Sequence, residues 1–346
     1  MVLHTYYNQR CKNWTPFILF SFHLTHTTKY YIYNLMQLTI TGYSTALFST
    51  WYFIEEWGIL FDAGDGLISS LLQKSRKIDQ VFISHADRDH LTGLLQLNQL
   101  NARPGFPVIH YPKDSSSFRA LEKFSKDFDP QVARTVWAPV TEGDEIFIAK
   151  DLLVKPIRNS HVPVDRHIIK SLGYQVIQTR KKLRPEFAHL SGDQLRQLAE
   201  QQGRDSFSME VRTNLLAYSG DTPVEDGDKW DNTSILIHEA TFLGNGEDIK
   251  VRHYGMTERS EGHDLGGPGH PGPTKVHSTL EEVMEMVSAI HIEQLILGHF
   301  SSRYSPDEIV RAVKDQCWKH AINIPVRVVL PGETLFDLLA KEPVNK

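Results

Sequence analysis

The feature that most constrains this chain is a group of metal-binding side chains at the end of a short apolar segment. The segment Val81-Phe82-Ile83-Ser84 has the pattern of a buried strand, and it leads directly into His85-Ala86-Asp87-Arg88-Asp89-His90. A helical pattern follows over about residues 90–100. Four side chains that can bind a metal therefore lie at one turn from a strand to a helix.

The spacing within this group favours two ions. Residues two apart in an extended backbone point the same way, so His85 and Asp87 can meet one ion. Asp89 and His90 enter the helix and turn toward a second ion. The alternative is a solvated acidic turn in which Asp89 only caps the helix. Four metal-capable side chains within six residues favour the metal site.

Three more candidate ligands, His161, Asp221 and His299, each follow an apolar run. A single His or Asp at a strand end is more often a capping or turn residue. Together, however, they complete a set, because a two-metal site needs roughly four ligands per ion with one bridging carboxylate. The predicted ligands are His85, Asp87, Asp89, His90, His161, His299 and, as the bridge, Asp221.

Strand and helix patterns alternate along the chain from Met36 onward, which predicts one layered α/β domain over residues 36–346. Residues 1–35 show no clear period and are predicted to be an extension. Strands are expected near residues 37–42, 47–54, 58–62, 80–84, 107–111, 145–148, 152–157, 173–178, 214–219, 234–238, 293–297 and 325–330. Helices are expected near 90–100, 115–126, 191–202, 279–290 and 306–319, and a Gly/Pro/His-rich loop over 261–273 is expected to border the site.

Composition limits the surroundings in which the protein works. The two cysteines, Cys11 and Cys317, can form at most one disulfide, which is typical of a reducing compartment and predicts the cytoplasm. No run approaches the roughly 18 apolar residues of a membrane-spanning helix, so no membrane association is expected. The net charge of -5 argues against a globally basic surface. A local basic run can still guide a nucleic-acid backbone, and it comprises Arg166, Lys170, Arg180, Lys181, Lys182 and Arg184.

The order and spacing of these motifs resemble the metallo-β-lactamase superfamily and, within it, ribonuclease Z, the endonuclease that trims tRNA 3′ ends. The resemblance covers most of residues 36–338. Besides the first cluster it rests on Leu60-Phe61-Asp62-Ala63-Gly64-Asp65-Gly66, Gly173-Tyr174, Tyr218-Ser219-Gly220-Asp221-Thr222, His238-Glu239-Ala240-Thr241-Phe242, His277-Ser278-Thr279 and Leu297-Gly298-His299-Phe300-Ser301-Ser302-Arg303-Tyr304. The last three motifs are typical of the ribonuclease Z branch rather than of the whole superfamily.

The resemblance implies an αββα four-layer sandwich with two divalent metal ions at the edge between its two sheets. It assigns the seven ligand roles to the residues named above, and it implies a homodimer. Asp87 departs from the pattern, since the family normally has His at this position. A carboxylate in place of an imidazole favours harder ions, so Mn²⁺ and Fe²⁺ remain alternatives to Zn²⁺.

The resemblance also implies catalytic and substrate-binding residues. Asp89 is expected to orient the nucleophile, and His277, held by Glu239, to protonate the leaving oxygen. Ser301, Ser302 and Arg303 offer hydroxyl groups and a guanidinium group that suit a phosphate. Without the resemblance, His277 reads as the neighbour of a helix cap and Glu239 as a buried charge paired with a basic residue. The Ser301 to Arg303 segment then reads as an ordinary helix N-terminus.

The predicted function is a metal-dependent phosphodiesterase or endoribonuclease that acts on a tRNA precursor. Two departures keep other functions open. The segment between Tyr174 and Leu215 is shorter than the family's RNA-gripping arm and lacks its Gly/Pro-rich tip, and residues 42–47 replace a Gly-rich loop. The alternatives are a hydrolase of the same fold for a small phosphodiester, ester, lactone or thioester, and a non-catalytic nucleic-acid-binding or scaffold protein.

Overall fold

The computed structural model describes residues 38–244 and 276–346, which form two β-sheets covered by helices. The extension predicted over residues 1–35 and the loop predicted over residues 261–273 lie outside this part of the chain. Among the described residues, no helix is both long enough and apolar enough to cross a bilayer.

The first sheet contains the first half of the described chain, with its strands in the order β1-β2-β3-β4-β5-β6. The strands are Ile40–Thr45 (β1), Ser49–Ile54 (β2), Ile59–Phe61 (β3), Gln80–Phe82 (β4), Val108–Pro112 (β5) and Val136–Val140 (β6). β1 to β3 pair antiparallel, and β3 to β6 pair parallel. The helices between the parallel strands are Leu67–Leu71 (α2), Leu94–Asn101 (α3) and Ser116–Phe128 (α4).

The second sheet has its strands in the order β13-β12-β11-β10-β9-β8-β7. These strands are Ile146–Ala149 (β7), Leu152–Arg158 (β8), Leu172–Leu183 (β9), Ser208–Tyr218 (β10), Thr233–Glu239 (β11), Ile292–Gly298 (β12) and Val326–Val328 (β13). β10 to β13 pair parallel. Helices Leu280–Ala289 (α6) and Pro306–Lys319 (α7) both begin with a capping box, which satisfies the free amide groups of their first turns.

Short 3₁₀ helices connect several of these elements. They are Glu55–Trp57 (η1), Leu72–Lys77 (η2), Arg88–His90 (η3), Pro130–Arg134 (η4), Pro185–Phe187 (η5), Arg204–Ser206 (η6), Gly227–Trp230 (η7) and Leu338–Ala340 (η8). The sequence predicts one helix over residues 90–100, but the structure has η3 followed by α3. It also forms α2 and β6, which the sequence does not predict.

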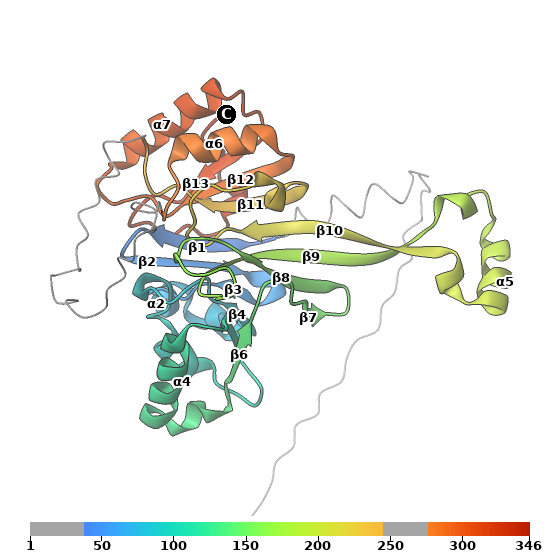
Figure 1. Ribbon diagram of the computed structural model, residues 1–346, viewed down its shortest axis with the longest axis horizontal. Coiled ribbons are helices and arrows are strands. Elements are labelled where there is room, and N and C mark those ends of the chain that lie inside the picture. The colour runs from blue at the N-terminus through green and yellow to red at the C-terminus, as the bar shows by residue number, and fades with distance from the viewer. Residues whose placement is uncertain (1–37, 245–275) are drawn as a thin grey trace, which may run out of the picture. The chain divides into compact units, whose positions relative to one another are not determined.

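Alternation along the strands creates the four layers. In β4, Val81 packs in the cluster that joins the first sheet to α2, α3 and α4, while Phe82 faces the second sheet and contacts Tyr174. Phe61 reaches across in the same way, with ring centroids 5.3 Å from Tyr218. α6 and α7 cover the other face of the second sheet (Figure 1). The predicted αββα sandwich is therefore confirmed.

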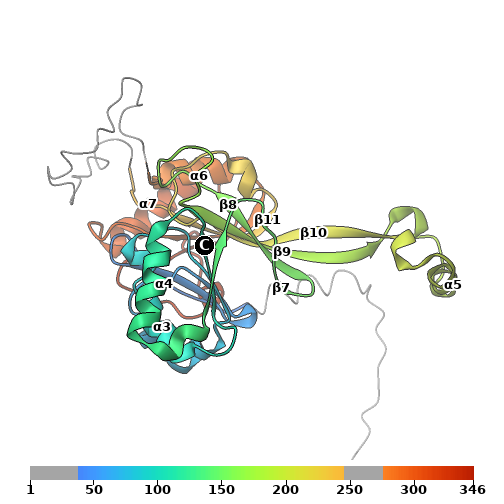
Figure 2. The ribbon, with the colours of Figure 1, turned by 60° about the horizontal axis from the view of Figure 1, so that its bottom comes forward.

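β9 and β10 continue beyond the rest of the second sheet as a two-stranded arm, with η5, α5 (Gly192–Gln202) and η6 at its far end (Figures 1 and 2). The pairing extends as far as Leu183 and Ser208. The segment predicted to lack a Gly/Pro-rich tip thus carries a capped helix at the end of this arm. The outer part of β9 is exposed and charged, so no apolar alternation marks it as a strand.

Gly298 ends β12 where the two sheets approach each other closely. A Cβ atom at this position would lie 2.1 Å from the Tyr52 hydroxyl oxygen of β2 and 3.1 Å from the Cβ of Ser44. The absence of a side chain therefore lets β12 meet the first sheet immediately before His299.

We expect Gly298→Ala to lower the free energy of unfolding by about 1–3 kcal/mol, the usual cost of overpacking a core. Tyr52→Phe removes the atom that clashes, so the double variant should regain part of this loss. Urea denaturation of the two single variants and the double variant measures the coupling. A double variant no more stable than Gly298→Ala would contradict this account.

Candidate metal centre

The predicted site residues gather at one edge of the two sheets. His85 to His90 follow β4, His161 follows β8, Asp221 follows β10 and His299 follows β12. β10, β11 and β12 are parallel, so their carboxyl ends meet at the same edge. The fold thus collects ligands that are more than 200 residues apart in the sequence, as the order of the motifs predicts.

One oxygen atom of Asp221 lies at the centre of the group. Asp221 Oδ2 is 3.2 Å from His299 Nε2, 3.3 Å from His90 Nε2 and 3.8 Å from His85 Nε2. Two groups of ligands lie beside this atom, and within each group the ligand atoms are no more than 4.8 Å apart. One group is His85, Asp87 and His161, and the other is Asp89, His90 and His299. The structure brings all seven predicted ligands together.

The four histidines share one hydrogen-bonding arrangement, in which Nδ1 contacts the protein. The partners are Asp62 Oδ2 for His90 (2.7 Å), Ser84 Oγ for His85 (2.9 Å), Thr241 Oγ1 for His299 (2.9 Å) and the Val276 carbonyl for His161 (2.9 Å). The Ser84 hydroxyl already donates to Asp62, so it accepts from His85. The Thr241 hydroxyl donates to Glu239 and accepts from His299 in the same way. Each ring therefore carries its hydrogen on Nδ1.

This tautomer leaves the Nε2 lone pairs free to bind a metal. The Nε2 atoms of His85, His90 and His299 are buried and have no hydrogen-bond partner. A buried acceptor without a partner is costly, and divalent ions bound at this site would satisfy these three atoms. Imidazole nitrogens oriented by a hydrogen bond on the other ring nitrogen, together with carboxylates, are a usual donor set for such ions. The residues present therefore fit a divalent metal.

The carboxylates of the site are held in their charged form. The His161 and His85 rings, whose Nε2 atoms lie 3.6 and 3.5 Å from Asp87 Oδ2, hold the pKa of Asp87 well below its usual range. Burial raises the pKa of Asp221, but the histidines around it, His299 and His90 foremost, outweigh burial and lower it. Asp87 is the most exposed ligand, with 62% of its side chain accessible, so the departure from the family pattern lies at the mouth of the site.

Asp62 is an essential part of the site that the sequence does not identify. It is fully buried and accepts hydrogen bonds from His90, the Ser84 amide and hydroxyl, and the Tyr218 hydroxyl. Its backbone is left-handed, with φ 53°, a strained conformation of the kind that gathers at functional sites. In the sequence it is one residue of the motif Leu60 to Gly66, at the end of an apolar strand, with no role of its own assigned to it. Thr241 is missed for the same reason, since it contacts ligands rather than the metal.

His277 lies beside the ligand set and is paired with Glu239. The distance from His277 Nδ1 is 3.1 Å to Glu239 Oε1 and 3.9 Å to Asp221 Oδ2. Glu239 is buried and also accepts hydrogen bonds from the Thr222 amide and the Thr241 hydroxyl. Burial lowers the pKa of His277, but the Glu239 carboxylate outweighs it and raises the pKa to about 9. His277 therefore holds a proton at neutral pH.

Ser301, Ser302 and Arg303 lie in the loop between β12 and α7. The Ser301 amide donates to the Thr241 carbonyl (3.0 Å), and Arg303 Nε donates to the Ser301 hydroxyl (3.0 Å). The Arg303 guanidinium also lies 5.5 Å from the ring centroid of Phe242. α7 begins only at Pro306, so these residues are not the first turn of a helix.

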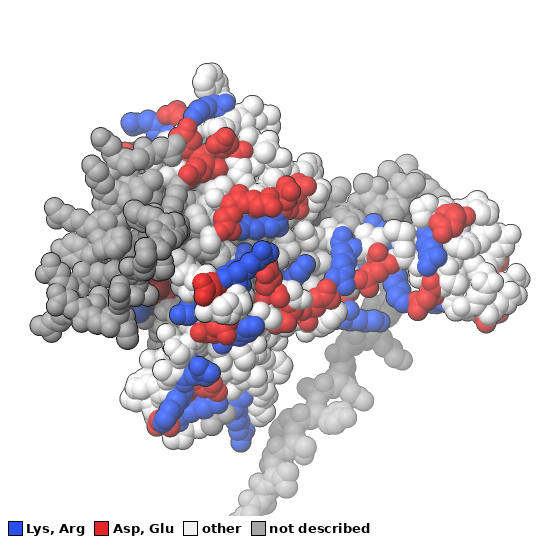
Figure 3. All heavy atoms as spheres, viewed as in Figure 1, with Lys and Arg blue, Asp and Glu red and all other residues white. Residues whose placement is uncertain are grey.

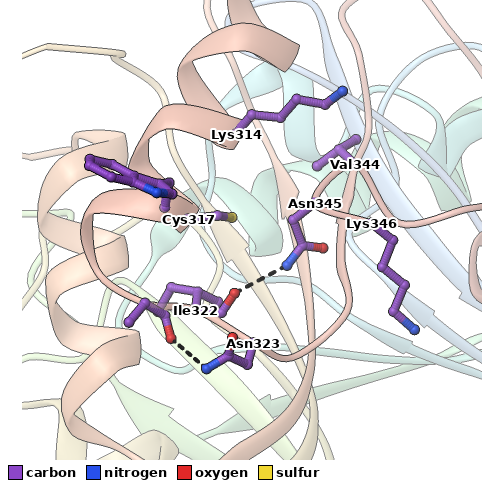
Figure 4. Close-up of a pocket in the computed structure, with 9 residues that line it drawn as sticks. Lys314, Cys317, Ile322, Asn323, Val344, Asn345 and Lys346 are labelled. Atoms are coloured by element: carbon purple, nitrogen blue, oxygen red, sulfur yellow. Dashed lines mark hydrogen bonds between the residues drawn. The ribbon is translucent and has the colours of Figure 1, made fainter.

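A separate cavity of about 490 Å³ lies between the end of α7 and the C-terminal residues. Figure 4 shows Lys314 and Cys317 on one side of it and Asn345 on the other, where the Asn345 side chain donates to the Ile322 carbonyl (3.3 Å). None of the predicted site residues lines this cavity.

The fold and the site together define a metal-dependent hydrolase with the metallo-β-lactamase fold. Residues 58–193 match the family model of the Beta-lactamase superfamily domain. The chain is 27% identical over 294 residues to tRNase Z TRZ2, chloroplastic, of Arabidopsis thaliana, covering 81% of this chain and 72% of that protein. It is also 27% identical over 291 residues to tRNase Z TRZ1 of Arabidopsis thaliana, covering 81% and 90%. The resemblance to ribonuclease Z is confirmed.

Solved structures agree on the fold. The metallo-β-lactamase fold protein YhfI from Bacillus subtilis matches 86% of this chain and 99% of its own with a TM-score of 0.53 and 14% identity. The short form of human tRNase Z matches 86% and 98% with a TM-score of 0.50 and 18% identity. At such identities these matches support the architecture rather than the substrate.

We expect Asp62→Asn to weaken divalent metal binding 10- to 100-fold, as loss of a group that orients a ligand usually does. The Asn side chain is uncharged, so it holds the Nδ1 hydrogen of His90 less strongly than the Asp62 carboxylate does. Titration of the metal-free chain with Zn²⁺ measures the change. Asp65→Asn, at an exposed position three residues away, is the control and should leave the affinity unchanged. Equal affinities for both variants would contradict the role of Asp62.

Proposed function

We propose that the protein is a dinuclear phosphodiesterase that cleaves RNA, with a tRNA precursor as its substrate. The observation that carries the proposal is the pairing of the ligand set with a histidine held by a buried carboxylate, since His277 lies 3.1 Å from Glu239 and 3.9 Å from the shared carboxylate Asp221. Phosphodiester hydrolysis needs an activated water and an acid for the leaving oxygen, and these two features supply them. The relatives named tRNase Z point to the same reaction.

The proposed ligands divide into His85, Asp87 and His161 for one ion and Asp89, His90 and His299 for the other, with Asp221 shared. Divalent ions in such a site lower the pKa of bound water and neutralise charge on a phosphate oxygen. We propose zinc, with Mn²⁺ or Fe²⁺ as alternatives because Asp87 adds a carboxylate. Asp89 accepts the Leu47 amide hydrogen at 3.0 Å, which fixes its carboxylate so that the other electron pairs can orient the attacking water.

His277 is the proposed general acid. Its Nδ1 hydrogen is held by Glu239, so Nε2 carries the proton that can pass to the leaving oxygen. Ser301, Ser302 and Arg303 are proposed to hold the phosphate, because they follow His299 directly and offer hydroxyl and guanidinium donors.

The arm is the proposed contact for the body of the RNA. Its basic run is not a uniform positive patch, because Lys181 pairs with Asp205 and Arg212 with Glu145. Lys and Arg alternate with Asp and Glu along the face in Figure 3. The proposal therefore rests on the shape and reach of the arm more than on its net charge.

A smaller substrate is the main alternative, and one observation favours it. The connection between β1 and β2 is a tight turn, Thr45 to Phe48, rather than a long loop that could hold a polynucleotide. A hydrolase of a small phosphodiester, ester, lactone or thioester would need no arm. A non-catalytic nucleic-acid-binding or scaffold role conflicts with the unpaired Nε2 atoms, which have no structural use without a metal.

We expect His85→Ala to reduce cleavage of a precursor tRNA by at least about 100-fold, since losing a ligand exceeds the cost of losing a group that only orients one. Cleavage is followed on gels with saturating divalent metal. His291→Ala, on the exposed surface, serves as the control. Intact cleavage by His85→Ala would contradict the proposed site.

Shortening the arm separates the two substrate classes. Replacing residues 185–206 by Asn-Gly closes the hairpin beyond the Arg184 to Phe207 hydrogen bond (2.9 Å) with a two-residue turn. We expect a loss of roughly tenfold or more in kcat/KM for precursor tRNA and no change for bis(p-nitrophenyl) phosphate. An equal effect on both substrates, or none on tRNA, would favour the small-substrate alternative.

A further inference from the structure

The turn between β1 and β2 joins both halves of the metal centre. The Leu47 amide donates to Asp89 Oδ2 at 3.0 Å, and the Ala46 amide donates to the Phe300 carbonyl at 3.3 Å. The Ser44 hydroxyl accepts the His299 amide hydrogen at 2.8 Å. The turn is therefore wedged between the carboxylate proposed to orient the water and the loop proposed to hold the phosphate.

The side chains on this turn are unusual for such a position. Leu47 is 87% exposed and Phe48 is 61% exposed, although both adjoin a site built of His and Asp. Leu47 has φ 71°, a left-handed conformation in which glycine is favoured over a bulky side chain. The Phe48 amide donates to the Thr45 carbonyl at 3.0 Å, which closes the turn without help from either side chain.

We propose that Leu47 and Phe48 form an apolar platform on which an unpaired base of the RNA stacks, next to the phosphate that is cleaved. This inference rests on the proposed function and adds a specificity determinant to it. A base offers an aromatic face whatever its sequence, and single-stranded RNA is commonly recognised by stacking on aromatic side chains. The turn and the segment proposed to hold the phosphate are joined by the Ala46 to Phe300 hydrogen bond, so a nucleotide next to that phosphate lies close to Leu47 and Phe48. The platform thus selects an unpaired end over a continuous duplex.

The test compares RNA hairpins with a single-stranded 3′ extension in which one nucleotide beside the cleavage site is intact or abasic. We expect Phe48→Ala to raise KM about tenfold on the intact RNA with kcat little changed, because one stacking contact is lost. On the RNA that is abasic at the stacking position, Phe48→Ala should add no further loss. Phe128→Ala, at a similarly exposed phenylalanine on α4, is the matched control and should change neither value. The proposal would be overturned if Phe48→Ala left KM on the intact RNA unchanged. It would also be overturned if Phe48→Ala raised KM on the abasic RNAs as much as on the intact RNA.

Leu47→Gly separates a substrate contact from a positioning role. It keeps the amide that donates to Asp89 and relieves the left-handed conformation, so the melting temperature should stay the same or rise. We expect KM on the intact RNA to rise and kcat to stay. A fall in kcat alone would mean that the turn only positions Asp89, and would overturn the proposal.

A binding measurement keeps this inference distinct from the proposed reaction. A 2-aminopurine base at the stacking position, in an RNA with a non-hydrolysable methylphosphonate at the cleavage site, should lose fluorescence on binding the wild-type chain and keep it with Phe48→Ala. Quenching by a chain that does not cleave RNA would support the platform and contradict the endonuclease. If the wild-type chain cleaves RNA but quenches the fluorescence no more than Phe48→Ala does, the endonuclease would be supported and the platform contradicted.

Discussion

The buried carboxylate of Asp62 is the contact on which the rest of the site depends. It lies at the end of a strand of the first sheet and accepts a hydrogen bond from Tyr218 of the second sheet. The same carboxylate fixes His90 directly and His85 through the Ser84 hydroxyl. The same carboxylate therefore helps to hold the two sheets together and to orient the ligands. A change that separates the sheets would also disturb the metal site.

A second chain of contacts does the same for the other half of the centre. Glu239 ends β11, accepts from Thr241 and holds His277, while Thr241 accepts from His299. Two buried carboxylates, Asp62 and Glu239, therefore set the tautomers of His90, His85, His299 and His277. Because each is satisfied by several donors, neither remains an unpaired buried charge, which would be costly.

The elements around the centre are of two kinds. The strand ends that carry ligands are short, buried and constrained, with glycine where the sheets come closest. The turn that bears Leu47 and Phe48 and the arm of β9 and β10 are exposed, and they differ from what the family pattern suggests. The proposed chemistry therefore lies at the buried edge of the sandwich, and the proposed contacts with substrate lie on segments that project from it.

The sequence by itself determines the strand ends and the residues that follow them. Apolar runs that stop at His85, His161, Asp221 and His299 predict a layered α/β fold with candidate ligands at its strand ends, because each signal is local, and the resemblance to a known family implies the αββα arrangement. Only the tertiary structure reveals Asp62 and Thr241, which act through contacts with residues distant in the sequence.

The arm was also decided by tertiary structure rather than by local pattern. The outer part of β9 is exposed and charged and carries no apolar alternation, and its pairing with β10 follows from the ladder that begins inside the sheet at Tyr174 and Tyr218. The same holds for the turn at Leu47, whose importance comes from Asp89 and Phe300 lying against it. A sequence records side chains one by one, whereas a shared hydrogen bond between distant loops exists only once the sheets have packed.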